Sequence, residues 1–410
     1  MTNLSFEELH QLPQRELPFT LEEFNQRLFN VRQQMAKDNI DMLYLTSPES
    51  MYYLTGYKAC WYGAQGPSSW PQYYGIALHR DHDKIIHIDI PAESNYIDYI
   101  SIPTVDKRII PKRADLSFIV NTLKDEGWLK GTLGMEFGSY RPNRVVSEQL
   151  EQAFIKGGSS HVVDATHILR QQRRIKSPQE IIYHEKAGEI LDAGYRALVN
   201  EARPGMTEME AFGILNLGMH KAGGDQCAMP YSFASGSRAI AGGHCLPSNK
   251  VMQQGEIFGA DPCGSVHQYH TNVCRVFSFG EPPKEMMDQY NIIAKAIKHV
   301  ENIIRPGMTV NEFAKGMREF YLEVGIWDQR NWVGGYEMGI AFAPDWVGEW
   351  EFTLGNFSEE GGFDERTLDE NFVCNFENVF SAGGAIDTLI IRDHKPIIPS
   401  FLDGSIYVIE

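Results

Sequence analysis

Apolar residues recur at helical spacing near the start of the chain. Between residues 20 and 38, one apolar stripe is formed by Leu21, Phe24, Leu28, Val31 and Met35. This spacing predicts an amphipathic helix that packs one face against a core. Thr20, followed three residues later by Glu23, has the pattern of a capping box, which marks the start of the helix.

The rest of the first 170 residues alternates between strand-like and helix-like patterns. Short apolar runs predict strands and longer periodic runs predict helices. The strands are expected at 42–47, 73–80, 84–90 and 132–137, and the helices at 115–126 and 143–156. This alternation indicates an α/β domain. A basic run and then Ser177-Pro178, a cap followed by a first-turn proline, precede a long helix. We therefore expect domains at 1–172 and 173–410.

The second half contains an internal repeat. The sequence RPGMT occurs at 203–207 and again at 305–309, each time after one helical pattern and before another. In both copies a Glu follows the Thr by three residues, so each new helix is expected to begin with a capping box. Two copies are too few for a solenoid. They predict a duplicated α+β domain with a pseudo-two-fold axis and a site between its halves.

Composition and charge exclude several classes of protein. Hydrophobic residues at 43% and charged residues at 22% are typical of a globular protein. A net charge of −17 argues against nucleic acid or an anionic membrane as partner, because both are polyanions. No signal peptide and no membrane-spanning segment is expected. Six Cys without a framework spacing are typical of reduced thiols, so we expect a cytoplasmic protein.

One short segment carries the side chains that bind transition metals. Residues 259–277 read GADPCGSVHQYHTNVCRVF and contain an Asp, two His and two Cys. The spacing includes neither C-x₂-C nor a paired H-x₃-H, so it matches no closed zinc site. In a strand, His267 and Tyr269 would lie on one face and His270 on the other. The segment is therefore either a metal site or a former one.

The chain resembles the creatinase, prolidase and aminopeptidase P superfamily over nearly its whole length. The resemblance rests on the duplicated unit, on IKSPQE at 175–180 and on the segment 259–277. It implies an α/β N-terminal domain of the creatinase type, followed by an α+β pita-bread domain with an internal pseudo-two-fold duplication. In metal-dependent members, five side chains of the second domain hold two metal ions that activate water.

Compared with that pattern, the chain keeps two of the five ligand positions. Asp261 and Glu377 match a first Asp and a first late Glu. The other three positions carry Asn272, Tyr336 and Ile386, with Asp387 one residue beyond the last. An amide and a phenol do not offset two divalent charges as a carboxylate and an imidazole would. We expect no metal and no cofactor; the alternative is a rebuilt mononuclear site within 259–277.

Two metal-free branches of the superfamily resemble different parts of the chain. Creatinase, which hydrolyses the guanidinium carbon of creatine, is similar at His244, its proton-transfer residue, and at Glu377. Ectoine hydrolase, which opens the cyclic amidine of ectoine, is similar in the turn GYEMGIAFAPDWVGEW at 335–350 and at Tyr269–His270. The resemblance implies His244, Asp261 and Glu377 as catalytic residues. The residues expected to bind substrate in these regions are Tyr269, His270, Tyr336, Glu337, Asp345 and Trp346.

Each of these assignments has a structural alternative. His244 could be a buried structural histidine, Asp345-Trp346 could form a tight turn, and Glu337 could face solvent. A further region, residues 53–75, is rich in aromatic residues and Gly, with Lys58 as its only cation. Tyr57 and Trp61 in this region could form a cage for a cationic substrate. The same loop could instead pack on a second copy of the chain, since the resemblance implies a homodimer.

These observations lead to three function classes. The first is a metal-independent hydrolase that cleaves a non-peptide C–N bond of a small cationic or zwitterionic amidine or guanidine, with His244 moving protons and the carboxylates of Asp261 and Glu377 holding the cation. The second is a metal-dependent relative, either a proline peptidase or a compatible-solute lyase similar to dimethylsulfoniopropionate lyase. The third is a non-catalytic binding module. Metal analysis separates the first two.

Overall fold

The chain forms two compact units. The computed structural model describes the chain except residues 1–4, 60–72, 113–114, 242, 355–364 and 382. The first unit comprises Met1–Arg173 and the second Arg174–Glu410. Within the described residues, no helix is long and apolar enough to cross a membrane.

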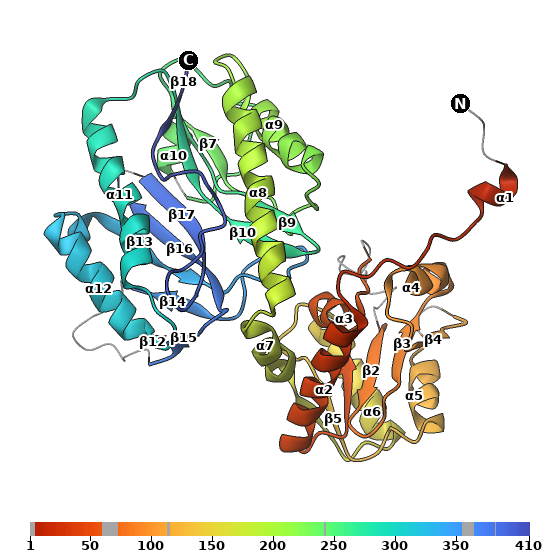
Figure 1. Ribbon diagram of the computed structural model, residues 1–410. Helices are drawn as coiled ribbons and strands as arrows, with labels where there is room; N and C mark the ends of the chain where they lie inside the picture. The colour runs from red at the N-terminus through yellow and green to blue at the C-terminus, as the bar shows by residue number, and fades with distance from the viewer. Residues whose placement is uncertain (1–4, 60–72, 113–114, 242, 355–364, 382) are drawn as a thin grey trace. The chain divides into compact units, whose positions relative to one another are not determined.

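The first unit is built on a six-stranded mixed sheet flanked by helices (Figure 1). The strand order is β4-β3-β2-β1-β5-β6, in which β1, β5 and β6 are parallel and β2 is antiparallel to both neighbours. The strands are β1 (Met42–Leu45), β2 (Gly75–His79), β3 (Ile85–Asp89), β4 (Val105–Ile109), β5 (Thr132–Met135) and β6 (His161–Asp164). The helices are α1 (Phe6–Leu9), α2 (Leu21–Lys37), α3 (Pro48–Thr55), α4 (Ser94–Ile100), α5 (Leu116–Asp125), α6 (Arg144–Gly157) and α7 (Thr166–Arg174), with a 3₁₀ turn, η2 (Pro91–Glu93). The predicted α/β domain is confirmed.

Helix α2 follows the predicted apolar stripe, with one difference at its start. The stripe is buried from Phe24 onward. The Thr20 hydroxyl accepts the backbone N–H of Glu23, as a capping box requires. The reciprocal bond, in which the Glu23 carboxylate would accept the Thr20 N–H, is not formed, because that carboxylate pairs with Arg27 one turn later at 3.0 Å. The predicted capping box is thus only half present.

The second unit contains two four-stranded sheets and a long helix, α8 (Pro178–Glu201), that lies along β9 and β10 (Figure 1). One sheet has the order β18-β11-β8-β7 and the other β14-β13-β16-β17. The elements before residue 280 are α9 (Glu208–Lys221), β7 (Phe233–Ser235), α10 (Ser237–Ala241), β8 (Ile257–Ala260), β9 (Cys263–Val266), β10 (Tyr269–Asn272) and β11 (Arg275–Phe279). Those after it are α11 (Lys284–Ile303), β12 (Met308–Thr309), α12 (Val310–Glu323), η3 (Trp327–Gln329), β13 (Arg330–Tyr336), β14 (Glu351–Thr353), β15 (Thr367–Leu368), β16 (Val373–Phe380), β17 (Gly383–Ile390) and β18 (Tyr407–Ile409).

The two RPGMT copies adopt the same local structure. In each, the Gly has a positive φ, 95° at Gly205 and 80° at Gly307, which glycine tolerates best. The Thr then caps the next helix, and both predicted capping boxes are confirmed, at α9 and at α12. The first residue of each helix donates its N–H to a carbonyl further along the chain, Glu208 to Lys250 and Val310 to Arg366.

The hairpin of β9 and β10 differs from the prediction in one respect. His267 and Gln268 have positive φ values, 48° and 66°, and form the two-residue turn between the strands. Such a turn matches the right-handed twist of its strands only when both central residues have positive φ. The expectation that His267 lies on a strand face beside Tyr269 is therefore wrong. His267 lies at the tip of the hairpin, with its ring 4.7 Å from that of Tyr183.

Candidate active site

The site is centred on Asp261, which directly follows β8. Its backbone N–H donates to the Ser232 carbonyl at 3.0 Å, which fixes the end of the strand. Burial raises the pKa of the Asp261 carboxyl to about 6, even though the hydrogen bond from Asn272 and the charge of His244 both lower it. A carboxyl with such a pKa exchanges a proton near neutral pH, which is a property of functional carboxyls.

Glu377 lies near the middle of β16. Alternation along this strand directs Asn375 and Glu377 to one face, while Cys374 and Phe376 belong to the apolar core. Burial, and next the charge of Asp261, raise the pKa of the Glu377 carboxyl to about 7. The two carboxyls therefore influence one another, and each resists ionisation while the other is charged.

Two amide side chains connect the two carboxyls. Asn272 Nδ2 donates to Asp261 Oδ1 at 2.9 Å and to the Pro262 carbonyl at 3.1 Å. Asn375 Nδ2 donates to Asn272 Oδ1 at 3.2 Å and to Glu377 Oε1 at 2.8 Å. We call this series of hydrogen bonds, Asp261–Asn272–Asn375–Glu377, the amide relay. Both amides are fully buried, so their orientation is set by these partners.

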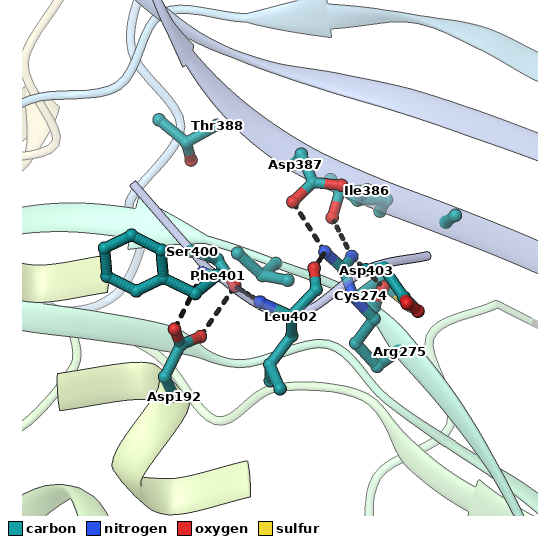
Figure 2. A network of polar contacts seen from close by, with 12 residues as sticks. Asp192, Cys274, Arg275, Ile386, Asp387, Thr388, Ser400, Phe401, Leu402 and Asp403 are labelled. Carbon is teal, nitrogen blue, oxygen red and sulfur yellow. Dashed lines mark hydrogen bonds and ion pairs between the residues drawn. The ribbon is translucent and has the colours of Figure 1, made fainter. Parts of the chain in front are cut away.

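The expected second late carboxylate is not replaced by its neighbour. Ile386 on β17 lies directly opposite Glu377 on β16, where it contributes no ligand. Asp387, the next residue, is directed away and pairs with Arg275 at 2.7 Å, both side chains being buried (Figure 2). Arg275 also donates to the carbonyls of Ile386 and Leu402. Asp387 therefore cannot serve the site.

Tyr336, at the end of β13, hydrogen-bonds the Glu377 carboxyl, and its phenol is within electrostatic range of Asp261. Burial, together with the negative charges of Glu377 and Asp261, raises the pKa of its phenol, which stays protonated. The phenol oxygen accepts the indole N–H of Trp346 at 3.1 Å. Trp346 is buried in the turn 337–350, whose Asp345 carboxylate accepts the N–H of Val347 at 3.0 Å. The turn thus holds an indole against the phenol.

Glu337 is directed into the protein. Its carboxylate forms a buried ion pair with Lys176 at 2.6 Å, and its backbone exchanges hydrogen bonds with Trp350 and Gly348. The alternative of a solvent-facing Glu337 is thus not realised. Since Lys176 belongs to the segment IKSPQE, this part of the sequence anchors the turn that carries Trp346.

His244 lies in the segment between α10 and β8 and is exposed. The alternative of a buried structural histidine is therefore wrong for this residue. Its positive charge lowers the pKa of Asp261, so the imidazole lies within electrostatic range of that carboxyl.

Tyr269 and His270 make contacts that occupy their polar atoms. The Tyr269 hydroxyl donates to Glu180 at 2.7 Å. His270 Nε2 accepts the N–H of Ala228 at 3.0 Å, and its Nδ1 lies 2.9 Å from the Gln268 carbonyl. Burial lowers the pKa of His270 to about 4, so the imidazole is neutral near pH 7. With both nitrogens engaged, His270 is built into the hairpin.

The two aromatic residues expected from the first half have different positions. Tyr57 is buried in the first unit, where its hydroxyl donates to Asp89 at 3.1 Å and contacts Glu93 at 3.3 Å. Trp61 lies outside the described residues.

The donor set does not fit a two-metal centre. Asn272 stands where a bridging carboxylate would be, and it presents N–H groups, which cannot ligate a cation, to Asp261. In the described part of the chain, no three His, Cys, Asp or Glu side chains gather in a way that could hold a metal ion. Asp261 and Glu377 occupy positions that match metal ligands in the family, and the amide relay links their two carboxyls by hydrogen bonds.

Sequence reasoning missed Asn375 and Lys176. Asn375 precedes Glu377 by two residues, and on a strand such a residue shares its face. This two-residue spacing could have identified Asn375 from the sequence as a neighbour of Glu377. Lys176 gave no such signal, because its partner Glu337 is 161 residues away.

Two family models match the chain in succession. The Creatinase/Prolidase N-terminal domain matches residues 27–175, and Metallopeptidase family M24 matches residues 183–386. The chain belongs to the creatinase, prolidase and aminopeptidase P superfamily. Its M24 domain is the pita-bread domain that the resemblance implied, and the family makes the protein a hydrolase.

Curated relatives and solved structures agree with this membership. The ectoine hydrolase of Halomonas elongata is 27% identical over 348 residues, which are 80% of this chain and 84% of the relative. A Xaa-Pro dipeptidase of Pyrococcus horikoshii is 26% identical and covers 61% of this chain and 66% of its own. The X-Pro aminopeptidase structure from Thermotoga maritima has a TM-score of 0.76 at 20% identity and covers 93% of this chain and 99% of its own, which shows a shared fold.

Proposed function

We propose that this M24 protein hydrolyses a non-peptide C–N bond of a small zwitterionic amidine or guanidine, similar to ectoine or creatine, without a metal. The observation that carries the proposal is the amide relay. It holds two carboxyls, each with a raised pKa, at positions that match metal ligands in the family. A planar organic cation supplies the positive charge that such a pair needs to ionise fully.

The proposed roles follow from charge and position. The carboxylates of Asp261 and Glu377 accept N–H groups of the cationic substrate and polarise its central carbon. The Tyr336 phenol, supported by Trp346, lines the same site, and Glu337 and Asp345 shape the turn around it. Exposed His244 is the proton-transfer group. Because Tyr269 and His270 are engaged elsewhere, their proposed contribution to substrate binding is through packing of the hairpin.

The reaction then proceeds in two proton-coupled steps. His244 removes a proton from water as the water oxygen bonds to the amidinium carbon, which gives a tetrahedral intermediate. The same imidazolium then returns that proton to the departing nitrogen as the C–N bond breaks, and the hydroxyl proton of the tetrahedral intermediate passes through the imidazole to the neutral amine that has left. An amidinium gives an amide and a protonated amine, and a guanidinium gives a urea and a protonated amine. No proton or electron is left unassigned.

The similarity to an ectoine hydrolase across 80% of the chain supports this substrate class. The second candidate is a metal-dependent proline peptidase, which is favoured by the similarity to Xaa-Pro dipeptidases. The substitution of three of the five family ligand positions weighs against it. We further propose that the protein acts in the cytoplasm as a homodimer.

One experiment compares the two candidates. Purified protein is given ectoine, creatine or an Xaa-Pro dipeptide, with and without excess EDTA, and the released amine is quantified. The expected result is turnover of an amidine or guanidine that EDTA leaves unchanged. Loss of turnover in EDTA with recovery in Mn²⁺ or Fe²⁺, or hydrolysis of the dipeptide alone, would contradict the proposal and favour the peptidase.

A further inference from the structure

A second carboxylate, Glu208, is buried outside the site already described. Glu208 is the first residue of α9, and none of its surface is exposed. Its Oε1 accepts the N–H of Ser235 at 2.8 Å and the hydroxyl of Ser235 at 2.9 Å. Its Oε2 accepts the N–H of Ser248 at 3.0 Å and the hydroxyl of Ser248 at 2.7 Å. Arg238 adds an ion pair at 3.2 Å.

These partners lie within the segment that carries His244 or directly beside its ends. Ser235 is the last residue of β7 and is followed by Gly236. Ser248 lies twelve residues beyond Gly236. Between these ends, Arg238 Nη2 donates to the Leu246 carbonyl at 2.7 Å, and the N–H of Phe233 donates to the Cys245 carbonyl at 2.9 Å. The Glu208 carboxylate thus joins the two ends of the segment 236–247, which we call the His244 segment.

The carboxylate is built to stay charged. Burial by itself raises the pKa of Glu208, but the hydrogen bonds from Ser248 and Ser235 and the charge of Arg238 outweigh it, and the net pKa is lowered. A buried carboxylate that accepts several donors is a strong and directional anchor. Loss of the charge would leave these buried donors without a full set of acceptors.

The duplication supplies an internal comparison. Glu208 lies five residues after Arg203 in the first copy, and the equivalent residue in the second copy is Val310. Val310 is also buried and also begins its helix, and its N–H makes the equivalent hydrogen bond to a distant carbonyl. The repeated unit therefore folds with an apolar residue at this position. A carboxylate is present only in the copy that has the His244 segment.

We propose that Glu208 is a positioning residue that fixes the His244 segment and thereby holds the imidazole beside Asp261. This inference rests on the proposed function for the role of His244, but not for the anchoring itself. Glu208 acts through the backbone and hydroxyl groups of Ser235 and Ser248. It does not touch the reacting atoms.

The test combines amide hydrogen exchange with kinetics on Glu208→Gln. The amide keeps the size of the side chain but presents N–H groups to donors and loses the ion pair with Arg238. We expect the peptide covering 233–248 to exchange roughly ten- to a hundredfold faster, with β11 unchanged. We also expect kcat to fall roughly tenfold or more with little change in KM, because a displaced proton-transfer group affects turnover more than binding.

The matched control is Glu210→Gln, in the same turn of α9 but exposed, which removes only a capping contact. It should leave both the exchange of 233–248 and kcat near the wild-type values. If Glu208→Gln does not fold, Ser248→Ala, which removes one of the donors, is measured in the same way. Unchanged exchange of 233–248, or unchanged kcat, in the folded variant overturns the inference.

His244→Ala, measured beside these variants, separates the two claims. Retained kcat in His244→Ala contradicts the proposed function. Faster exchange in Glu208→Gln would still support the anchoring role, because the exchange measurement needs no substrate.

Discussion

At the scale of single residues, Asn272 determines how the Asp261 carboxyl is held. Asn272 lies eleven residues after Asp261, and its side-chain amide donates a hydrogen bond to the Asp261 carboxyl at 2.9 Å. The Asn272 backbone is fixed on both sides by Thr388, whose hydroxyl accepts its N–H and donates to its carbonyl, each at 2.9 Å. The amide is therefore a rigid part of the site.

The first prediction concerns His244. If this imidazole transfers the proton, His244→Ala lowers kcat by roughly 10²–10⁴-fold, the usual contribution of general acid–base catalysis. KM changes much less, because the carboxylates of Asp261 and Glu377 hold the substrate charge. Steady-state kinetics on the substrate found in the EDTA experiment measure both. His394→Ala, which removes an imidazole that is 97% exposed, is the matched control and should match the wild type.

The second prediction concerns the pH dependence of cation binding. The pKa values of Glu377 and Asp261 are raised to about 7 and about 6, so lowering the pH protonates first Glu377 and then Asp261. A cation binds the ionised pair and must displace these protons. Affinity is therefore full above both pKa values and falls as the pH drops through 7 and then 6, by up to about tenfold per pH unit for each proton.

Acetamidinium is a suitable probe, since it remains a cation throughout this range. Calorimetric titration from about pH 8 to pH 5 should show the loss of affinity and a release of protons on binding near pH 7. In Glu377→Gln the step near pH 7 should disappear, leaving a weaker site. An affinity that does not change with pH in the wild type would show that the carboxyls do not bind the cation.

At the scale of helices and strands, local patterns predicted the structure well where nearby residues determine it. The capping boxes predicted at the starts of α9 and α12 are both formed, and Ser177, predicted as the cap of α8, forms a capping box with Glu180. At α2 the same pattern gave half a box, because Arg27 competes for Glu23. A sequence pattern identifies the groups that can bond, while neighbours decide which bonds form.

Contacts between distant strands were beyond the reach of such patterns. The resemblance to the family identified Asp261, Glu377 and the three substituted ligand positions. It could not reveal the amide relay, because Asn272 on β10 and Asn375 on β16 meet only when strands 103 residues apart come together. The turn at His267 was missed for a different reason, since His-Gln is not among the residue pairs typical of a two-residue hairpin turn with two positive φ values.

At the scale of the whole molecule, both units match the superfamily architecture, and the family resemblance predicted that architecture correctly. The second unit carries every described residue of the proposed chemistry. The two copies also differ at one buried position, since α9 and α12 begin alike but only the first copy has a buried carboxylate at its first helical position.

The Arg275–Asp387 pair also affects how the second unit unfolds. Arg275 belongs to β11 in the first copy, whereas Asp387 and the Ile386 carbonyl belong to β17 in the second. If one copy unfolded alone, the buried charge in the other copy would lose its partner, at a cost of about 3–5 kcal/mol. The two copies should therefore lose structure in one cooperative transition, with van't Hoff and calorimetric enthalpies that agree for this unit. The fluorescence of tryptophans in the second unit, such as Trp327 and Trp346, reports its unfolding. Two separate transitions in this fluorescence would show that the two copies unfold independently.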